Sequence, residues 1–150
     1  MKTTVTTSGF AELDAALAQI EKTATAKAAM RRSLEKAAQP IADMAAGLAP
    51  VDRGALQASV AVGTKLSKRQ SAMHRKMFKN DKAAVEIFVG AGALSSSTQQ
   101  EFGNEHNAPQ PFMRPAWDAE AKPTLERLGK EMWADIKRTA ERAAKKAAKG

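Results

Sequence analysis

The chain contains no cysteine and no tyrosine, and aromatic residues make up only 5% of its 150 positions. Without cysteine, neither a disulfide nor a thiolate metal site can form. The sequence also lacks a run of about 20 apolar residues, so it predicts no membrane-spanning helix and no membrane partner. The first ten residues lack the apolar core of a signal peptide, and we therefore expect synthesis in the cytoplasm.

Acidic residues are also scarce: 24 Lys and Arg stand against 16 Asp and Glu, which gives a formal net charge of +8. This balance favours polyanionic or acidic partners. The length predicts a single domain over residues 1–150, with roughly 70% of the unfolded chain's surface buried on folding. Because the abundant alanine buries little area, a monomer's core would be thin, and we expect a homo-oligomer.

Apolar residues recur at helical spacing in several segments. This spacing predicts helices over residues 10–20 and 23–48, with a kink or break at Pro40. A short helix over 95–102 should stop at Gly103. The last helix should follow Pro115, with a kink or second start at Pro123. The residues expected on the buried stripe of this last helix are Trp117, Ala121, Leu125, Leu128, Met132, Ile136 and Ala140.

Alternating or β-branched residues predict strands at 3–7, 56–66 and 83–89. The resulting fold class is α+β, with long helices packed on one face of a small, mostly antiparallel β-sheet with a long basic hairpin. The residues expected to face inward from the helix over 23–48 are Met30, Leu34, Ile41, Met44 or Ala45, and Leu48.

Two segments are rich in basic residues. The basic hairpin, residues 65–82, connects two strands that we expect to pair, and a connection of this length is usually functional or disordered. A solvated loop, contact with DNA phosphates and contact with an acidic protein remain open, although Met73, Met77 and Phe78 favour a protein. The basic C-terminal helical tail, residues 137–150, should fray at its end. The basic residues of the hairpin are Lys65, Lys68, Arg69, Arg75, Lys76, Lys79 and Lys82.

The stretch NAPQPFMRPAWD, residues 107–118, combines three prolines with bulky apolar residues and one arginine. Proline fixes φ and pushes the preceding residue to an extended conformation, so residues 107–111 should form a stiff arm. The bulky residues of this arm either close the domain's own core or dock on a neighbouring subunit. The candidate protein interface is Pro109, Pro111, Phe112, Met113, Arg114, Pro115 and Trp117.

The sequence gives little support for catalysis. The two histidines, His74 and His106, lie in no motif that we can assign, and Glu101, Glu105 and His106 do not match a metal-ligand spacing. The glycines at 90–92 lack the lysine of a phosphate-binding loop and suit strand ends better. We therefore predict no enzyme, no catalytic residue, no cofactor and no metal.

Two motifs together carry a family resemblance. EFGN (101–104) followed by APQPFMRPAWD, and APVDRGALQASV (49–60) upstream, resemble the EFG…PFxRPA and APxDTGALRxS segments of the gp-ten-like tail-component family of HK-type siphophages. The chain differs from that pattern at Arg53, where the family usually has threonine, and at Gln57, where it usually has arginine. The family is distantly similar to the lambda tail completion protein.

This resemblance implies a structural virion protein at the head–tail junction or the tail completion site of a tailed phage or phage-derived particle. It implies a homo-oligomeric ring, for which we expect six copies, with other head–tail junction or tail proteins as partners. Two alternatives stay open: a tail terminator or neck stopper ring, and a non-specific nucleic-acid-binding protein that contacts DNA in the channel.

Overall fold

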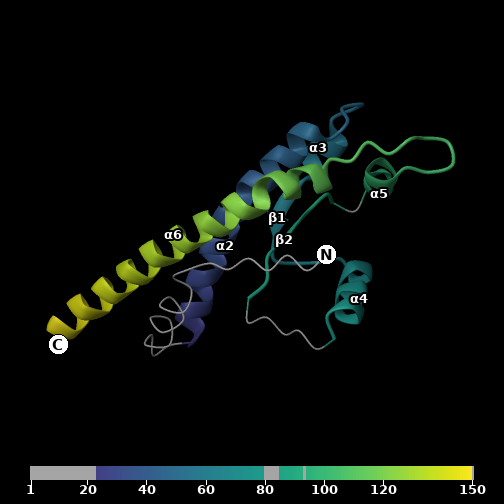
Figure 1. Cartoon of the computed structure of the whole chain (residues 1–150). Helices are drawn as coiled ribbons and strands as arrows, with labels where there is room; N and C mark the ends of the chain where they lie inside the picture. The colour runs from purple at the N-terminus through teal and green to yellow at the C-terminus, as the bar shows by residue number, and fades with distance from the viewer. Residues whose placement is uncertain (1–22, 80–84, 93, 150) are drawn as a thin grey trace.

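The computed structural model describes residues 23–79, 85–92 and 94–149 (Figure 1). Two long helices, α2 (Thr23–Leu48) and α6 (Met113–Ala148), lie side by side in opposite directions and form the main layer. A two-stranded antiparallel sheet packs against α2, which contacts both strands. This arrangement confirms the α+β class. The strand and helix expected at 3–7 and 10–20 lie outside the described residues.

The bounds of α2 match the prediction, but its buried face is different. Ile41 and Ala45 are buried as expected, but small residues make up the rest of that face, and Leu48 is exposed. Met30 and Leu34 are only partly buried. The helix is not divided at Pro40. The buried residues of α2 and its end are Ala29, Ser33, Ala37, Ala38, Ile41, Ala42, Ala45 and Ala49.

The predicted strand over residues 56–66 is largely wrong. Gly54 adopts a left-handed conformation, with φ at 74°, and the short helix α3 (Ala55–Ser59) follows it. Ala, Leu and Gln favour a helix locally, and the Ser59 hydroxyl donates a hydrogen bond to the Leu56 carbonyl, 2.7 Å away. Only strand β1 (Ala61–Gly63) remains of the expected strand.

Strand β2 (Phe88–Gly90) pairs with β1 in antiparallel register, with Val62 opposite Val89. It is shorter than the strand expected at 83–89, of which residues 83–84 are not described. The basic hairpin between these strands is not a simple loop, because it contains helix α4 (Lys68–Met77). A capping box begins this helix: Ser67 accepts from the Gln70 N–H, and the Gln70 side chain accepts from the Ser67 N–H.

Helix α5 (Ser95–Phe102) has the predicted bounds and ends at Gly103. The last helix, α6, begins two residues before Pro115 and continues through Pro123 to Ala148, so the tail is helical further than expected. Met132 and Ile136 of the predicted stripe are buried, but Trp117 and Ala140 are exposed, and Ala116 is buried at the start of the helix. The core where α6 begins consists of Ala45, Ala49, Leu56, Phe112 and Ala116.

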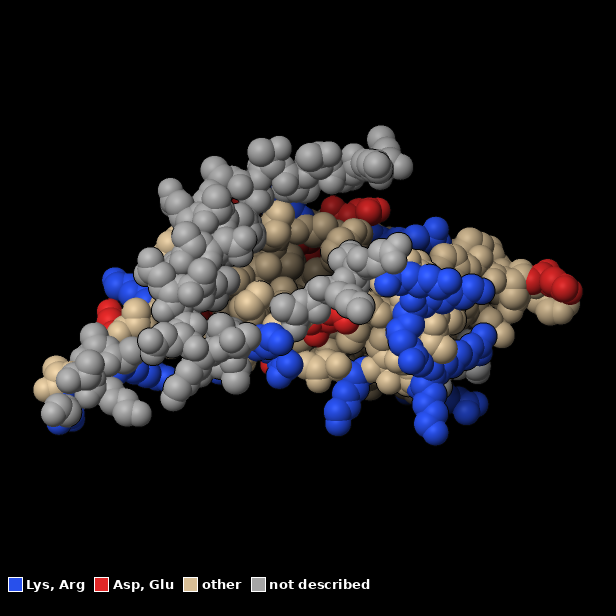
Figure 2. Space-filling model, turned by 90° about the horizontal axis from the view of Figure 1, so that it is seen from below, with Lys and Arg blue, Asp and Glu red and all other residues tan. Residues whose placement is uncertain are grey.

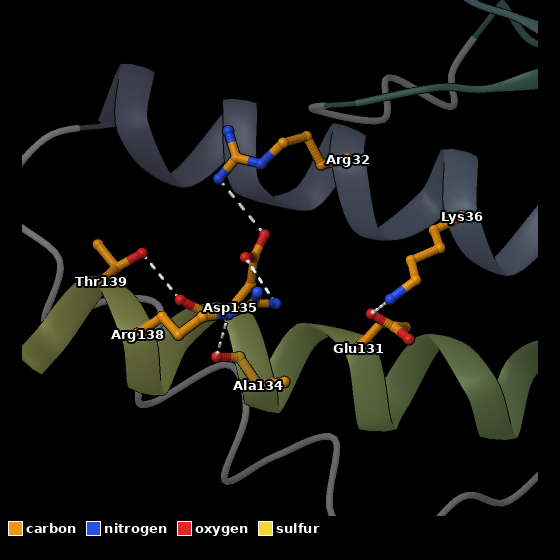
Figure 3. A network of polar contacts seen from close by, with 7 residues as sticks. All are labelled: Arg32, Lys36, Glu131, Ala134, Asp135, Arg138 and Thr139. Carbon is orange, nitrogen blue, oxygen red and sulfur yellow. Dashed lines mark hydrogen bonds and ion pairs between the residues drawn. The ribbon is translucent and has the colours of Figure 1, made fainter.

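Ion pairs join α2 and α6 along their exposed edge (Figure 3). Lys36 Nζ lies 2.8 Å from a Glu131 carboxylate oxygen, and Arg32 lies 3.4 Å from Asp135, which also contacts Arg138. The Arg32 and Lys36 side chains are mostly exposed, so each pair contributes about 0–1 kcal/mol. These contacts fix the register of the two helices more than they stabilise the fold.

Candidate functional site

Five hydrogen bonds converge on Glu101, where α5 ends and α6 begins. The buried Glu101 carboxylate accepts hydrogen bonds from the backbone N–H groups of Phe112 (2.8 Å), Met113 (2.9 Å) and Arg114 (3.1 Å). The Arg114 side chain donates through Nε to the same carboxylate at 3.0 Å and through Nη2 to the Glu101 carbonyl at 2.8 Å. We call this set of contacts the Glu101 clamp.

The clamp provides hydrogen-bond acceptors for the backbone N–H groups at the start of α6. The first N–H groups of a helix lack partners within the helix, and the helix dipole places positive charge there. In α6, Glu101 takes the N–H groups of Met113 and Arg114, and Pro115 has no N–H to satisfy. The clamp therefore ties α5 to the start of α6. The sequence alone did not identify Glu101 as the acidic partner of this helix start.

The environment of Glu101 acts on its pKa in two opposing ways. Burial alone raises the pKa of the carboxyl, because a charge is poorly solvated there. The hydrogen bonds from the N–H groups of Met113, Phe112 and Arg114, and from the Arg114 side chain, favour the charged form more strongly. The pKa of Glu101 therefore lies below its ordinary value of 4.5, and the group is a carboxylate at neutral pH.

The loop between the clamped elements is held by its own hydrogen bonds. Gly103 has φ at 75°, and a side chain there would meet the Asn107 carbonyl and the Pro109 ring at 2.9 Å. The Asn104 side chain accepts from the N–H groups of His106 and Asn107 at 2.9 and 2.8 Å. The Gln110 N–H donates to the Gln100 carbonyl at 2.7 Å. The Gln110 bond ties the proline arm to α5, and the Asn104 bonds close the turn that precedes the arm.

Large side chains are exposed around the clamp. The guanidinium of Arg114 lies over the exposed Phe102 ring, 5.0 Å from its centroid. Trp117 is 59% exposed and follows Arg114 by three residues, which places both on one face of α6. We call Phe102, Arg114 and Trp117 the Arg114 patch. Leu48 and Val51 are exposed at the same end of the molecule, since they flank the buried Ala49.

Of the residues predicted as the interface of the proline arm, some are buried in the core and others are exposed. Phe112 is 1% exposed and belongs to the core, so of the two alternatives the core is right for this residue. Met113 packs partly against the same core. Pro109, Pro111 and Pro115 are exposed, and so are Arg114 and Trp117, which are the members that a neighbour could contact.

A second candidate surface lies on α4. No residue of this helix is buried, and the basic side chains around it are exposed. Lys and Arg side chains gather on one face of the space-filling view (Figure 2), on the side where α4 lies in Figure 1. Met73, Met77 and Phe78 are also exposed, with Met77 at 74%. The basic residues described here are Lys65, Lys68, Arg69, Arg75, Lys76 and Lys79; Lys82 is not described.

His74 connects α4 to the sheet. Its ring lies 4.9 Å from the Phe78 ring and meets the Phe88 ring of β2 edge-on at 5.4 Å. Its Nε2 lies 3.4 Å from a Glu86 carboxylate oxygen. His74 therefore has a structural place in the fold that sequence reasoning did not find.

Within the described residues, no cluster of three or more His, Asp or Glu side chains is arranged to hold a metal ion. Gly63 and Gly90 lie at the ends of their strands, as expected. None of the described helices is both long enough and apolar enough to cross a membrane.

The described residues thus form a small α+β fold that exposes large side chains, among them Phe102 and Trp117, at one end. A family model described as "Bacteriophage HK97-gp10, putative tail-component" matches residues 11–103. No curated protein and no solved structure matches the chain.

The match covers more than half of the chain, and the protein belongs to this HK97-gp10-like family of phage tail components. It includes the APVDRGALQASV segment and ends at Gly103, directly after Glu101 and Phe102. The resemblance inferred from the sequence motifs is thereby confirmed. The proline arm and α6 lie beyond the matched residues.

Proposed function

We propose that the protein is a structural component of the head–tail junction or the tail completion site, where it forms a ring and docks on a neighbouring ring through the Arg114 patch. Family membership supports a structural role in the tail. The position in the particle, the ring and the expected six copies are our inference. A tail terminator or a neck stopper would use the same kind of assembly at a different position.

The Arg114 patch is the observation that carries this proposal. Tryptophan and arginine are the residues most enriched among those that dominate binding energy at protein interfaces. Here an exposed tryptophan, an arginine and a phenylalanine lie together at one end of the molecule. The core beside them consists mainly of alanine, and Phe112 is its one large, fully buried side chain. The chain thus leaves outside the large side chains that a self-sufficient monomer would bury.

The Glu101 clamp suits the patch for binding. Ordering a long side chain on association costs about 0.5–1.5 kcal/mol, and a side chain that is already ordered avoids that cost. Two hydrogen bonds to Glu101 and the stacking on Phe102 hold Arg114 before any partner arrives. The clamp also fixes the start of α6, from which Trp117 projects. A rigid patch of this kind favours docking without a change of backbone conformation.

Two substitutions test the proposal, because one removes an exposed ring and the other a buried one. Trp117→Ala should leave the melting temperature of the purified protein nearly unchanged but stop assembly, so that heads and tails accumulate separately. Phe112→Ala should lower stability by about 3–5 kcal/mol, because it removes a fully buried ring. The measurements are thermal melting and electron microscopy of particles from cells that express each variant in place of the wild type.

Normal particles with Trp117→Ala would contradict docking through the patch. Sedimentation of the wild type tests the ring separately. We expect a concentration-dependent oligomer, or a monomer that assembles only on the particle. A monomer at every concentration, together with a particle that contains one copy, would contradict the ring and leave the docking test intact.

A further inference from the structure

Helix α4 has a basic face that turns away from the rest of the molecule. At 100° per residue, Lys68, Arg69, Arg75 and Lys76 fall within one arc of about 120°. Ser71 and His74 fall on the opposite side and are partly buried, whereas the four basic side chains are exposed. Residues 64–79 contain no acidic residue. This arc of α4 therefore carries positive charges and no negative ones.

A strip of apolar side chains borders this basic arc. Met73 and Met77 are four residues apart, so they lie one turn above the other on the same face of α4. They are 57% and 74% exposed. Exposed methionines are unusual on a surface that only meets water, and flexible methionine side chains are typical of surfaces that adapt to a protein partner.

Contacts with the sheet hold the orientation of α4. The ring of His74 packs against Phe88 of β2 and against Phe78 at the end of the helix. The capping box at Ser67 fixes the start of the helix. Because the inner side of α4 is attached in this way, its basic arc and its methionine strip stay outward.

We infer that α4 is a second docking surface, separate from the Arg114 patch, and that its partner is an acidic protein surface that also carries apolar side chains. The partner should be acidic because its charge must complement the basic arc of α4. The partner should also carry apolar side chains, because Met73 and Met77 can pack only against such groups.

Other partners fit the same surface less well. DNA phosphates would pair with the basic arc but would leave Met73 and Met77 without contacts. A helix that inserts into a membrane surface carries bulkier residues such as Trp, Phe and Leu along its apolar face, and α4 has two methionines there. A second copy that met α4 with its own α4 would bring two basic arcs together, and like charges opposite each other disfavour binding. An acidic protein of the particle satisfies both parts of the surface.

Binding of three labelled probes to the purified full chain tests this inference by fluorescence anisotropy. The probes are an amphipathic helical peptide of Glu and Leu, an all-Glu peptide of the same charge, and a 20-base-pair DNA duplex. The inference expects tightest binding to the Glu/Leu peptide. Arg75→Glu with Lys76→Glu should weaken that binding at least ~10-fold. Met73→Ser with Met77→Ser should weaken it about 5-fold, although every charge is kept.

The control is Lys122→Glu with Lys130→Glu, which makes the same charge change on the exposed surface of α6 and should have little effect. Circular dichroism checks that each variant keeps its helices. No binding of the Glu/Leu peptide, tighter binding of DNA, or an unchanged affinity after the methionine substitutions would overturn the inference. None of these outcomes depends on the Arg114 patch, so the docking proposal is tested separately.

Discussion

Replacing Glu101 with glutamine should destabilise the protein well beyond the loss of one exposed ion pair. The carboxylate accepts from four donors, two on each oxygen: Phe112 and Met113 on one, and the backbone and side chain of Arg114 on the other. Glutamine keeps one acceptor oxygen and turns an NH₂ group toward the other pair of donors. Two hydrogen bonds to a charged group are thus lost.

The magnitude follows from these contacts. Each hydrogen bond to a charged group contributes about 1.5–3 kcal/mol. Water screens the part that involves the Arg114 side chain, which is 56% exposed. We therefore expect Glu101→Gln to lower the free energy of unfolding by about 3 kcal/mol. For a domain of this size, that corresponds to a melting temperature roughly 6–12 °C lower.

Thermal melting followed by circular dichroism measures this change, and Arg114→Met is the matched comparison. The methionine variant loses the ion pair but leaves the three backbone N–H groups on Glu101, so it should lower stability by only about 1 kcal/mol. If Glu101→Gln melts with the wild type, or if Arg114→Met is equally destabilised, Glu101 does not hold the start of α6 through its backbone contacts.

Two further predictions concern the same region. The folded-state pKa of Glu101 lies below 4.5, so its contribution to stability is fully present above that pH and is lost as pH falls through the folded value. The melting difference between wild type and Glu101→Gln should therefore stay constant from neutral pH down to about 4.5 and shrink as the pH is lowered further. Gly103→Ala should lower the free energy of unfolding in urea by about 1–3 kcal/mol, because Gly103 has a positive φ. Gly129→Ala, in open space within α6, should raise it by about 0.5–1 kcal/mol. Equal effects of the two substitutions would contradict a conformational role of Gly103.

The helices α2 and α5 were predictable from local sequence, because helix-stopping residues mark the C-terminal end of each. Gly47 and Pro50 mark the end of α2, and Gly103 ends α5 with the positive φ that glycine adopts readily. The failure at 56–66 has an equally local cause. Alternation of Leu56, Ala58 and Val60 resembles a strand, but the part that forms α3 is only five residues long, and over so short a stretch alternation does not exclude a helix.

The buried faces of the long helices were harder to predict. Of the large apolar residues expected inside α2, Ile41 is buried and Leu48 is exposed, and the rest of the buried face consists of alanines and Ser33. Small residues let two helices approach closely, and hydrophobicity alone does not rank them as core. In α6 the earlier start at Met113 and the burial of Phe112 set the register, so Ala116 faces α2 and Trp117 faces outward.

The Glu101 clamp depends on tertiary contact and could not be read from local spacing. Glu101 and Arg114 are thirteen positions apart and lie on different helices. The signal that was available is chemical: a glutamate directly before a predicted helix stop, and an arginine beside the proline that begins the next helix. The helix inside the basic hairpin also had a local signal, in the capping pair Ser67 and Gln70.

The unbroken course of α6 makes it a spacer of fixed length. Its 36 residues correspond to about 54 Å at 1.5 Å per residue. Trp117 lies near one end, and the exposed Arg142, Lys145 and Lys149 lie at or just beyond the other. A helix cannot stretch without breaking its hydrogen bonds, so whatever contacts one end is held at a set distance from the other. Removing four residues would shorten that distance by about 6 Å and turn one end by about 40° relative to the other.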